Sequence, residues 1–152
     1  MTLAEMNAAS MRLYNIGKEI FTRLAISDTL YTNEEKLQMD GDFEAEPFKV
    51  HLKYSIYPEN GIATIFSVLP FDVPQTRASE FAKLICDMNY NDFYAGNYDY
   101  NVERGKVVFR LALVFRNSIL SKELVEECIQ YSIATVSKNN DRLFEAARDK
   151  TL

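Results

Sequence analysis

The chain offers few side chains that could perform chemistry. Its single histidine, His51, stands between Lys49 and Lys53 in a stretch where apolar and polar residues alternate. A histidine that acts as a general base needs a burying pocket or an orienting partner. A solvated histidine on the polar side of a strand is therefore the favoured interpretation, and no catalytic residue is predicted.

The two cysteines are separated by 42 positions (128 − 86), and both fall on predicted helix faces with apolar neighbours. One histidine and two distant cysteines are too few for a structural zinc site. Lys83 is the one cation close to Cys86 in the sequence, which gives weak support for an activated thiolate. We expect Cys86 and Cys128 to be reduced and buried, without a disulfide, in a cytoplasmic protein.

Acidic clusters also invite a functional interpretation. Asp40 and Asp42, with Gly41 between them, resemble the start of a calcium loop, but no bidentate glutamate follows at the required position. A solvated acidic loop is the simpler interpretation of this segment, which continues to Glu46. The glycines stand singly, so there is no glycine-rich phosphate loop. The sequence therefore predicts neither a metal nor a cofactor.

Composition limits the function classes further. The 152 residues suit a single domain spanning 1–152, with 47% hydrophobic and 26% charged residues. The 22 acidic residues outnumber the 17 basic ones, and the net charge of −5 argues against nonspecific nucleic-acid binding. No apolar run approaches the roughly 20 residues of a membrane span. The first residues lack the pattern of a secretory signal, so we expect no membrane partner.

The first half of the chain predicts one helix and one hairpin. Apolar residues recur at helical spacing over residues 3–25. Residues 27–47 are polar and acidic, which predicts an irregular segment with a short strand near 37–39. Residues 48–57 alternate with period two, and a turn ending at Gly61 returns the chain as a second strand over 62–69.

The second half predicts a helix, a second hairpin and a long final helix. Apolar residues form one stripe between Ala78 and Met88, and the asparagines that follow suit the end of a helix. Strands over 93–101 and 106–116 flank another four-residue loop that ends in glycine. Ser121 is the expected N-cap of the last helix. The predicted fold class is α+β, in the order α-β-β-(β)-α-β-β-α, with flanking helices on an antiparallel sheet.

The register of the two hairpins predicts which side chains share a face of the sheet. Two four-residue loops place Tyr57 opposite Ile62 and Asn101 opposite Lys106. One face is then strongly apolar and must be covered by helices. The other face is mixed, and its apolar members are predicted to meet another subunit or a client protein: Phe66, Val68, Phe93, Val108 and Val114. The alternative is that a helix of the same chain covers them, because a one-residue error in either loop exchanges the faces.

An ordered series of residues in the second half resembles the YbjN family. The series comprises Leu69-Pro70, Val73-Pro74, Asn89, Asn91, Gly96-Asn97-Tyr98, Gly105, Phe109-Arg110 and Ser121-Lys122-Glu123. Members of this family are often labelled sensory transduction regulators, and their fold resembles that of type III secretion chaperones. The resemblance covers residues 69–152 and implies a commonly dimeric domain without established enzyme activity. It offers no catalytic residues to carry over.

Two function classes stay open on this evidence. The favoured one is a non-enzymatic, chaperone-like homodimer that binds a client by strand addition or in an apolar groove. The alternative is a small-molecule-sensing regulatory domain with a pocket between sheet and helices. Tyr90, Tyr94, Tyr98 and Tyr100 fit either class, as core packing or as the rim of a binding groove.

Overall fold

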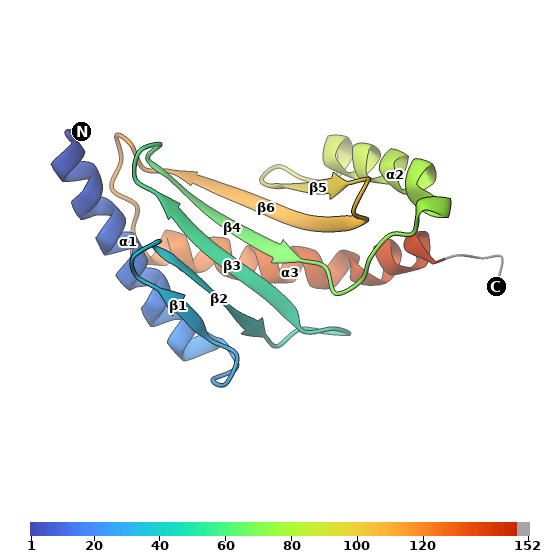
Figure 1. The fold of residues 1–152 in the computed structure, drawn as a ribbon, viewed down its shortest axis with the longest axis horizontal. Coiled ribbons are helices and arrows are strands. Elements are labelled where there is room, and N and C mark those ends of the chain that lie inside the picture. The colour runs from blue at the N-terminus through green and yellow to red at the C-terminus, as the bar shows by residue number, and fades with distance from the viewer. Residues whose placement is uncertain (149–152) are drawn as a thin grey trace.

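The computed structural model describes residues 1–148 and has an α+β architecture (Figure 1). Helices and strands follow one another in an order that confirms the predicted fold class. The elements are α1 (Leu3–Leu24), β1 (Tyr31–Asn33), β2 (Gln38–Phe43), β3 (Val50–Tyr57), β4 (Ile62–Val68), a 3-10 turn η1 (Gln75–Arg77), α2 (Ala78–Asn91), β5 (Asn97–Asn101), β6 (Lys106–Val114) and α3 (Lys122–Ala147).

The strands of residues 1–148 form one antiparallel sheet in the order β1-β2-β3-β4-β6-β5. The predicted hairpin registers are confirmed, since Tyr57 pairs with Ile62 and Asn101 pairs with Lys106. Gly61 and Gly105 close the two loops at φ values of +64° and +67°. Side chains are strained in this left-handed region, which explains glycine at both positions.

The helices lie on one side of the sheet and bury its apolar face (Figure 1). One row of this face runs across four neighbouring strands through the paired residues Met39, Tyr54, Ile65 and Leu111. All four side chains are buried. Burial of such apolar surface is the main force that holds helices to a sheet.

Helix α1 approaches strand β3 closely at one residue. A Cβ atom on Gly17 would lie 2.4 Å from Cε1 of Tyr54, so any larger residue would collide with the ring. The Tyr54 hydroxyl donates a hydrogen bond of 3.1 Å to the carbonyl oxygen of Leu13. Burial raises the pKa of Tyr54, because the phenolate form would lose its hydration. Glycine lowers the stability of a helix, but at position 17 its lack of a Cβ atom is what lets α1 pack directly against Tyr54 of β3.

Helix α3 crosses the same side of the sheet and is anchored to α1. Its N-cap is Ser121, as predicted, whose hydroxyl accepts a hydrogen bond from the Leu124 amide. Lys122 pairs with Glu19, and Arg23 pairs with Glu126 at 2.7 Å. These charge pairs are largely exposed, so the buried apolar stripe of α3 contributes more to its position. That stripe includes Val125, Ile129, Val136 and Leu143.

Three sequence predictions need correction. Residues 27–47 are not largely irregular, because β1 and β2 extend the sheet there. The fifth strand begins at Asn97 rather than at residue 93, since Gly96 has a φ of +75° that breaks the extended chain. Cys86 is exposed and not buried, although Cys128 is half-buried, and both are free thiols. Cys86 was expected to be buried because its neighbours in the sequence are apolar, but helical spacing alone did not show that it lies on the exposed side of α2.

We expect substitution of Gly17 by alanine to lower the free energy of unfolding by about 1–3 kcal/mol, measured by urea denaturation. The new methyl group must displace the Tyr54 ring, which outweighs the roughly 1 kcal/mol that alanine gains in a helix. Gly41→Ala is the matched control, because its Cβ would meet Ala25 at an ordinary 3.4 Å. Equal stability of both variants would contradict the docking role of Gly17.

Candidate functional site

The side of the sheet opposite the helices forms an open face, which Figure 1 shows toward the viewer. No helix of residues 1–148 lies over it in that view. The strand register defines its central members: His51, Lys53, Ser55 and Tyr57 on β3, Ile62, Thr64, Phe66 and Val68 on β4, and Val108, Arg110, Ala112 and Val114 on β6. We use the name open face for this set.

An apolar stripe runs along the middle of the open face. It consists of Ile62, Phe66 and Val68 on β4 with Val108, Ala112 and Val114 on β6. Val114 is 64% exposed, Phe66, Val68 and Val108 are half-buried, and Ser55 and Thr64 of the open face are buried. The buried Thr64 and the charged Arg110 lie between the members of this stripe. Exposed apolar side chains gathered on one face are typical of interaction sites in soluble proteins. Four of the five predicted partner-binding residues thus lie together here.

Phe93, the fifth predicted residue, does not lie on the open face. Its ring packs edge-on against Tyr98 at 5.6 Å and against Phe109 at 5.5 Å, and both of these are buried on the helix side. The physical reason is the late start of β5, which leaves Phe93 in the loop after α2. Its side chain is therefore free to turn back toward α3.

Charged residues border the apolar stripe on both sides. In the register, Phe66 lies between Lys53 of β3 and Arg110 of β6. The Arg110 guanidinium pairs with Asp99 of β5 at 3.0 Å. A polar rim around an apolar centre is the usual arrangement of a protein-binding surface.

His51 on this face has acidic partners that the sequence did not predict. Its Nδ1 lies 2.7 Å from Oδ1 of Asp42, and its Nε2 lies 3.5 Å from Oδ1 of Asp40. Both aspartates belong to β2. Because residues 27–47 were expected to be largely irregular, the sequence did not predict that these carboxylates lie beside His51. The imidazole is thus oriented, but it stands on an open sheet where water reaches it. General acid-base catalysis is usually found in a pocket that excludes water.

Other reactive groups give little support for chemistry. Burial, together with the nearby charge of Glu127, raises the pKa of the Cys128 thiol, which disfavours a nucleophilic thiolate at neutral pH. Within residues 1–148, no three histidine, cysteine, aspartate or glutamate side chains gather closely enough to bind a metal ion. In that same part of the chain, no helix has the length and apolar character to cross a membrane.

Strand β5 lies at one edge of the sheet, and the side chain of Asn89 covers part of its outer edge. The Asn89 amide donates to the Tyr98 carbonyl oxygen at 2.9 Å and accepts from the Tyr98 N–H at 2.8 Å. These two bonds reproduce what a neighbouring strand would offer. Asn89 lies in the last turn of α2, where the sequence predicted the helix to end, and it has this additional role. The edge of β5 is therefore unavailable at Tyr98.

The opposite edge of the sheet is also protected. The N–H of Ile26 donates to the Asp42 carbonyl oxygen at 2.8 Å, and the Asp42 N–H donates to the Thr29 hydroxyl at 2.9 Å. These contacts cap the part of β2 that extends beyond β1, which itself has only three residues. Short or covered edges offer little backbone for a client strand to pair with. Strand addition is therefore disfavoured at both edges.

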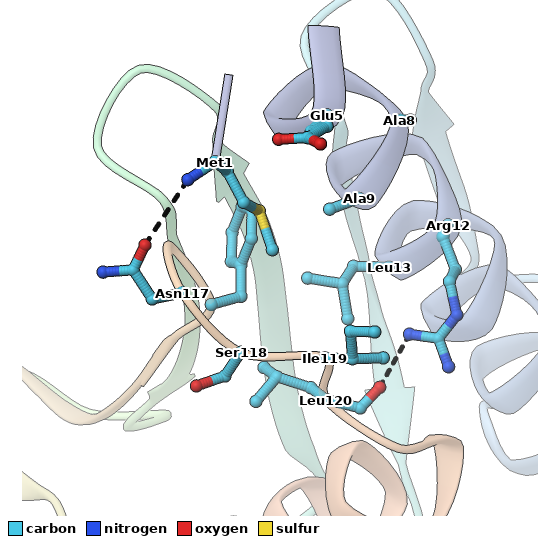
Figure 2. A pocket seen from close by; sticks show the side chains of 11 residues that line it. Met1, Glu5, Ala8, Ala9, Arg12, Leu13, Asn117, Ser118, Ile119 and Leu120 are labelled. Carbon is cyan, nitrogen blue, oxygen red and sulfur yellow. Dashed lines mark hydrogen bonds between the residues drawn. The ribbon is translucent and has the colours of Figure 1, made fainter. Parts of the chain in front are cut away.

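A cleft of about 690 Å³ separates the first half of α1 from the loop between β6 and α3 (Figure 2). Its walls carry Ala8, Ala9, Leu13, Phe115 and Leu120, with Glu5 and Arg12 among the polar residues at its rim. The Arg12 guanidinium donates to the Leu120 carbonyl oxygen at 2.7 Å. The side chain of Ile119 is 85% exposed. This second apolar surface was not predicted from the sequence.

Two members of the tyrosine group pack against other side chains, and the other two are exposed. Tyr98 is buried in the core, and its burial raises the pKa of its hydroxyl. Tyr100 packs edge-on against Phe81 at 5.0 Å. Tyr90, in the last turn of α2, and Tyr94, in the loop after it, are instead highly exposed. The predicted strand over 93–101 implied that Tyr94 would share the covered face with Tyr98, and its exposure corrects that expectation.

Comparison with known proteins supports the fold. No family model matches the chain, and no curated protein matches it. Among solved structures, the crystal structure of the ExsC–ExsE complex is similar, with a TM-score of 0.61 over 87% of this chain and 93% of that chain. The sequences are 12% identical. The predicted type III secretion chaperone-like fold is confirmed, whereas the YbjN resemblance stays a prediction.

We expect Asn89→Ala to lower the free energy of unfolding by about 1–3 kcal/mol, because two hydrogen bonds to the backbone of the buried Tyr98 are lost. Hydrogen exchange of the Tyr98 amide should accelerate in the same variant. Asn91→Ala serves as the control, since the Asn91 amide is exposed and contacts only Asp87 in the described residues. Slow exchange at Tyr98 in both variants would contradict the edge-closing role.

Proposed function

We propose that this protein is a non-enzymatic, chaperone-like module that binds a client protein in the cytoplasm and acts as a homodimer. The client contacts the apolar stripe of the open face, chiefly Phe66, Val68, Val108 and Val114. The observation that carries this proposal is the stripe itself, an apolar surface on a sheet face that no helix of residues 1–148 covers. Phe93 takes no part in it, because its ring packs on the helix side.

The structural comparison supports the same function class. The similar crystal structure is that of a complex of ExsC with ExsE. A fold that recurs in a protein complex is compatible with many functions, so the surface of this chain carries the proposal. The surface has an apolar centre and a charged rim, as protein-binding sites have.

The closed sheet edges favour one binding mode over the other. A client that added a strand would need free backbone groups on β5, or on β1 and the end of β2 that β1 leaves unpaired. Asn89 occupies those of Tyr98, and the loop before β1 occupies those of Asp42. We therefore favour side-chain contacts across the open face over strand addition.

A second candidate function is the sensing of a small apolar molecule. The cleft beside α1 favours it, because a volume of about 690 Å³ lies in the range of ligand pockets. The apolar part of such a ligand would contact Leu13 and Phe115 in the wall of the cleft. Titration with a panel of apolar ligands, followed by thermal unfolding, distinguishes this function from client binding.

The double substitution Phe66→Ser and Val68→Ser should remove client binding while leaving the protein folded. We expect the recovery of a co-purifying protein from the native cytoplasm to fall about tenfold or more, because the centre of the interface is lost. The free energy of unfolding should fall by only about 1–2 kcal/mol, since both side chains are half-exposed on a strand.

The matched control for this experiment is Tyr94→Ser, which removes an exposed aromatic side chain outside the open face. It should leave client recovery unchanged. A parallel loss of client recovery and stability in the double variant would show that the stripe serves folding alone. Equal recovery from all three proteins would also count against the proposal.

A further inference from the structure

Two hydrogen bonds tie the walls of the cleft beside α1 together (Figure 2). The Arg12 guanidinium donates to the Leu120 carbonyl oxygen at 2.7 Å, and the Met1 amine donates to Oδ1 of Asn117 at 3.5 Å. In Figure 2 these two contacts stand on opposite sides of the cleft, and each joins the N-terminal part of the chain to the loop between β6 and α3. An occupant must fit between them, which favours a narrow, unbranched molecule.

The cleft itself is lined mainly by apolar side chains. Leu13 and Phe115 belong to the buried core and form its inner wall. Ala8 and Ala9 line it from α1, and Ile119, which is 85% exposed, borders it from the loop. An alkyl chain in this cleft would cover Ile119 and displace water from the two alanines. Such burial of apolar surface is the main driving force for the binding of an apolar ligand.

Among the residues of 1–148 that line this cleft, Arg12 has the one positively charged side chain. Its described hydrogen bond uses Nη1, whereas a guanidinium has five N–H donors. In the same part of the chain, Arg23 and Arg142 each pair with a carboxylate, but Arg12 does not. An arginine that is held in place and keeps free N–H groups is well suited to bind a carboxylate.

The negative side chain of the cleft, Glu5, is already engaged by the chain itself. It lies seven residues before Arg12 on α1, which is about 10 Å along the helix. Its Oε2 accepts a hydrogen bond of 2.7 Å from the Thr2 amide, and this backbone contact lowers the pKa of Glu5. A carboxylate ligand is therefore attracted to Arg12 and repelled by Glu5, which determines where its charged group lies.

We infer that the cleft beside α1 binds an unbranched monocarboxylate, such as a medium-chain fatty acid. The carboxylate pairs with Arg12, and the alkyl chain lies over Leu13 and Phe115 between the two hydrogen bonds that tie the walls together. This ligand class rests on the second candidate function, the sensing of a small apolar molecule, and does not depend on the client.

Isothermal titration calorimetry of the full chain tests the ligand class with octanoate, decanoate and 1-octanol, each below the concentration at which it forms micelles. We expect octanoate to bind with a dissociation constant of about 100 μM. It should bind about tenfold more tightly than 1-octanol, because only the carboxylate pairs with Arg12. Decanoate should bind about tenfold more tightly than octanoate, because its additional methylene groups are buried in the cleft.

Substitutions separate the charged group of the ligand from its alkyl chain. Arg12→Gln should weaken octanoate binding about tenfold and leave 1-octanol binding unchanged. Unchanged 1-octanol binding in this variant also shows that the cleft keeps its shape without the bond to Leu120. Lys18→Gln is the matched control, because it removes a positive charge from α1 outside the cleft and should change neither affinity.

A further variant tests the position of the ligand. Ala8 is exposed and lines the cleft, so a larger side chain there can enter the cleft without disturbing the core. Ala8→Phe should weaken octanoate and 1-octanol alike, by about tenfold or more. Unchanged binding of both ligands in this variant would overturn the cleft as their site.

The outcomes separate the ligand class from the proposed functions. Equal affinities for octanoate and 1-octanol, or unchanged octanoate binding in Arg12→Gln, overturn the carboxylate and leave the sensing of an apolar molecule in place. If none of the three ligands binds saturably up to about 1 mM, both the ligand class and the sensing function are overturned. Client binding at the open face is tested independently by the Phe66 and Val68 double variant.

Discussion

The close contact between Gly17 and Tyr54 determines how the rest of the molecule is arranged. It lets α1 lie directly on β3, and the Tyr54 hydroxyl fixes the helix further by its bond to Leu13. With α1 in place, α3 can pair with it through the Glu19 and Arg23 contacts and complete the cover of the apolar face. A helix held further from the sheet would leave the Tyr54 hydroxyl without its partner in the core.

The sequence predicted the fold well where local chemistry decides the structure. Alternation along 48–57, glycine at positions 61 and 105, and the Ser121 cap each act within a few residues, and each appears in the structure as expected. The hairpin registers followed from loop length alone. Register in turn placed Phe66 and Val68 on the correct face of the sheet.

The errors arose where tertiary contacts override local pattern. The β1–β2 hairpin lies in a polar segment, and β2 is stabilised mainly by pairing with the strong strand β3. Phe93 was assigned by alternation, yet the positive φ of Gly96 starts the strand after it. Neither the partners of His51 nor the cleft beside α1 has a local signature, because each joins residues from separate elements.

The closing of the β5 edge by one amide has a chemical consequence. Asparagine can satisfy both backbone groups of Tyr98 because its side chain carries a donor and an acceptor together. Hydrolysis of that amide to a carboxylate would leave two acceptors and direct one of them at the Tyr98 carbonyl oxygen. Deamidation of Asn89 would therefore leave the backbone groups of Tyr98 unpaired at the edge of β5. An unpaired strand edge favours edge-to-edge aggregation of the protein during long storage.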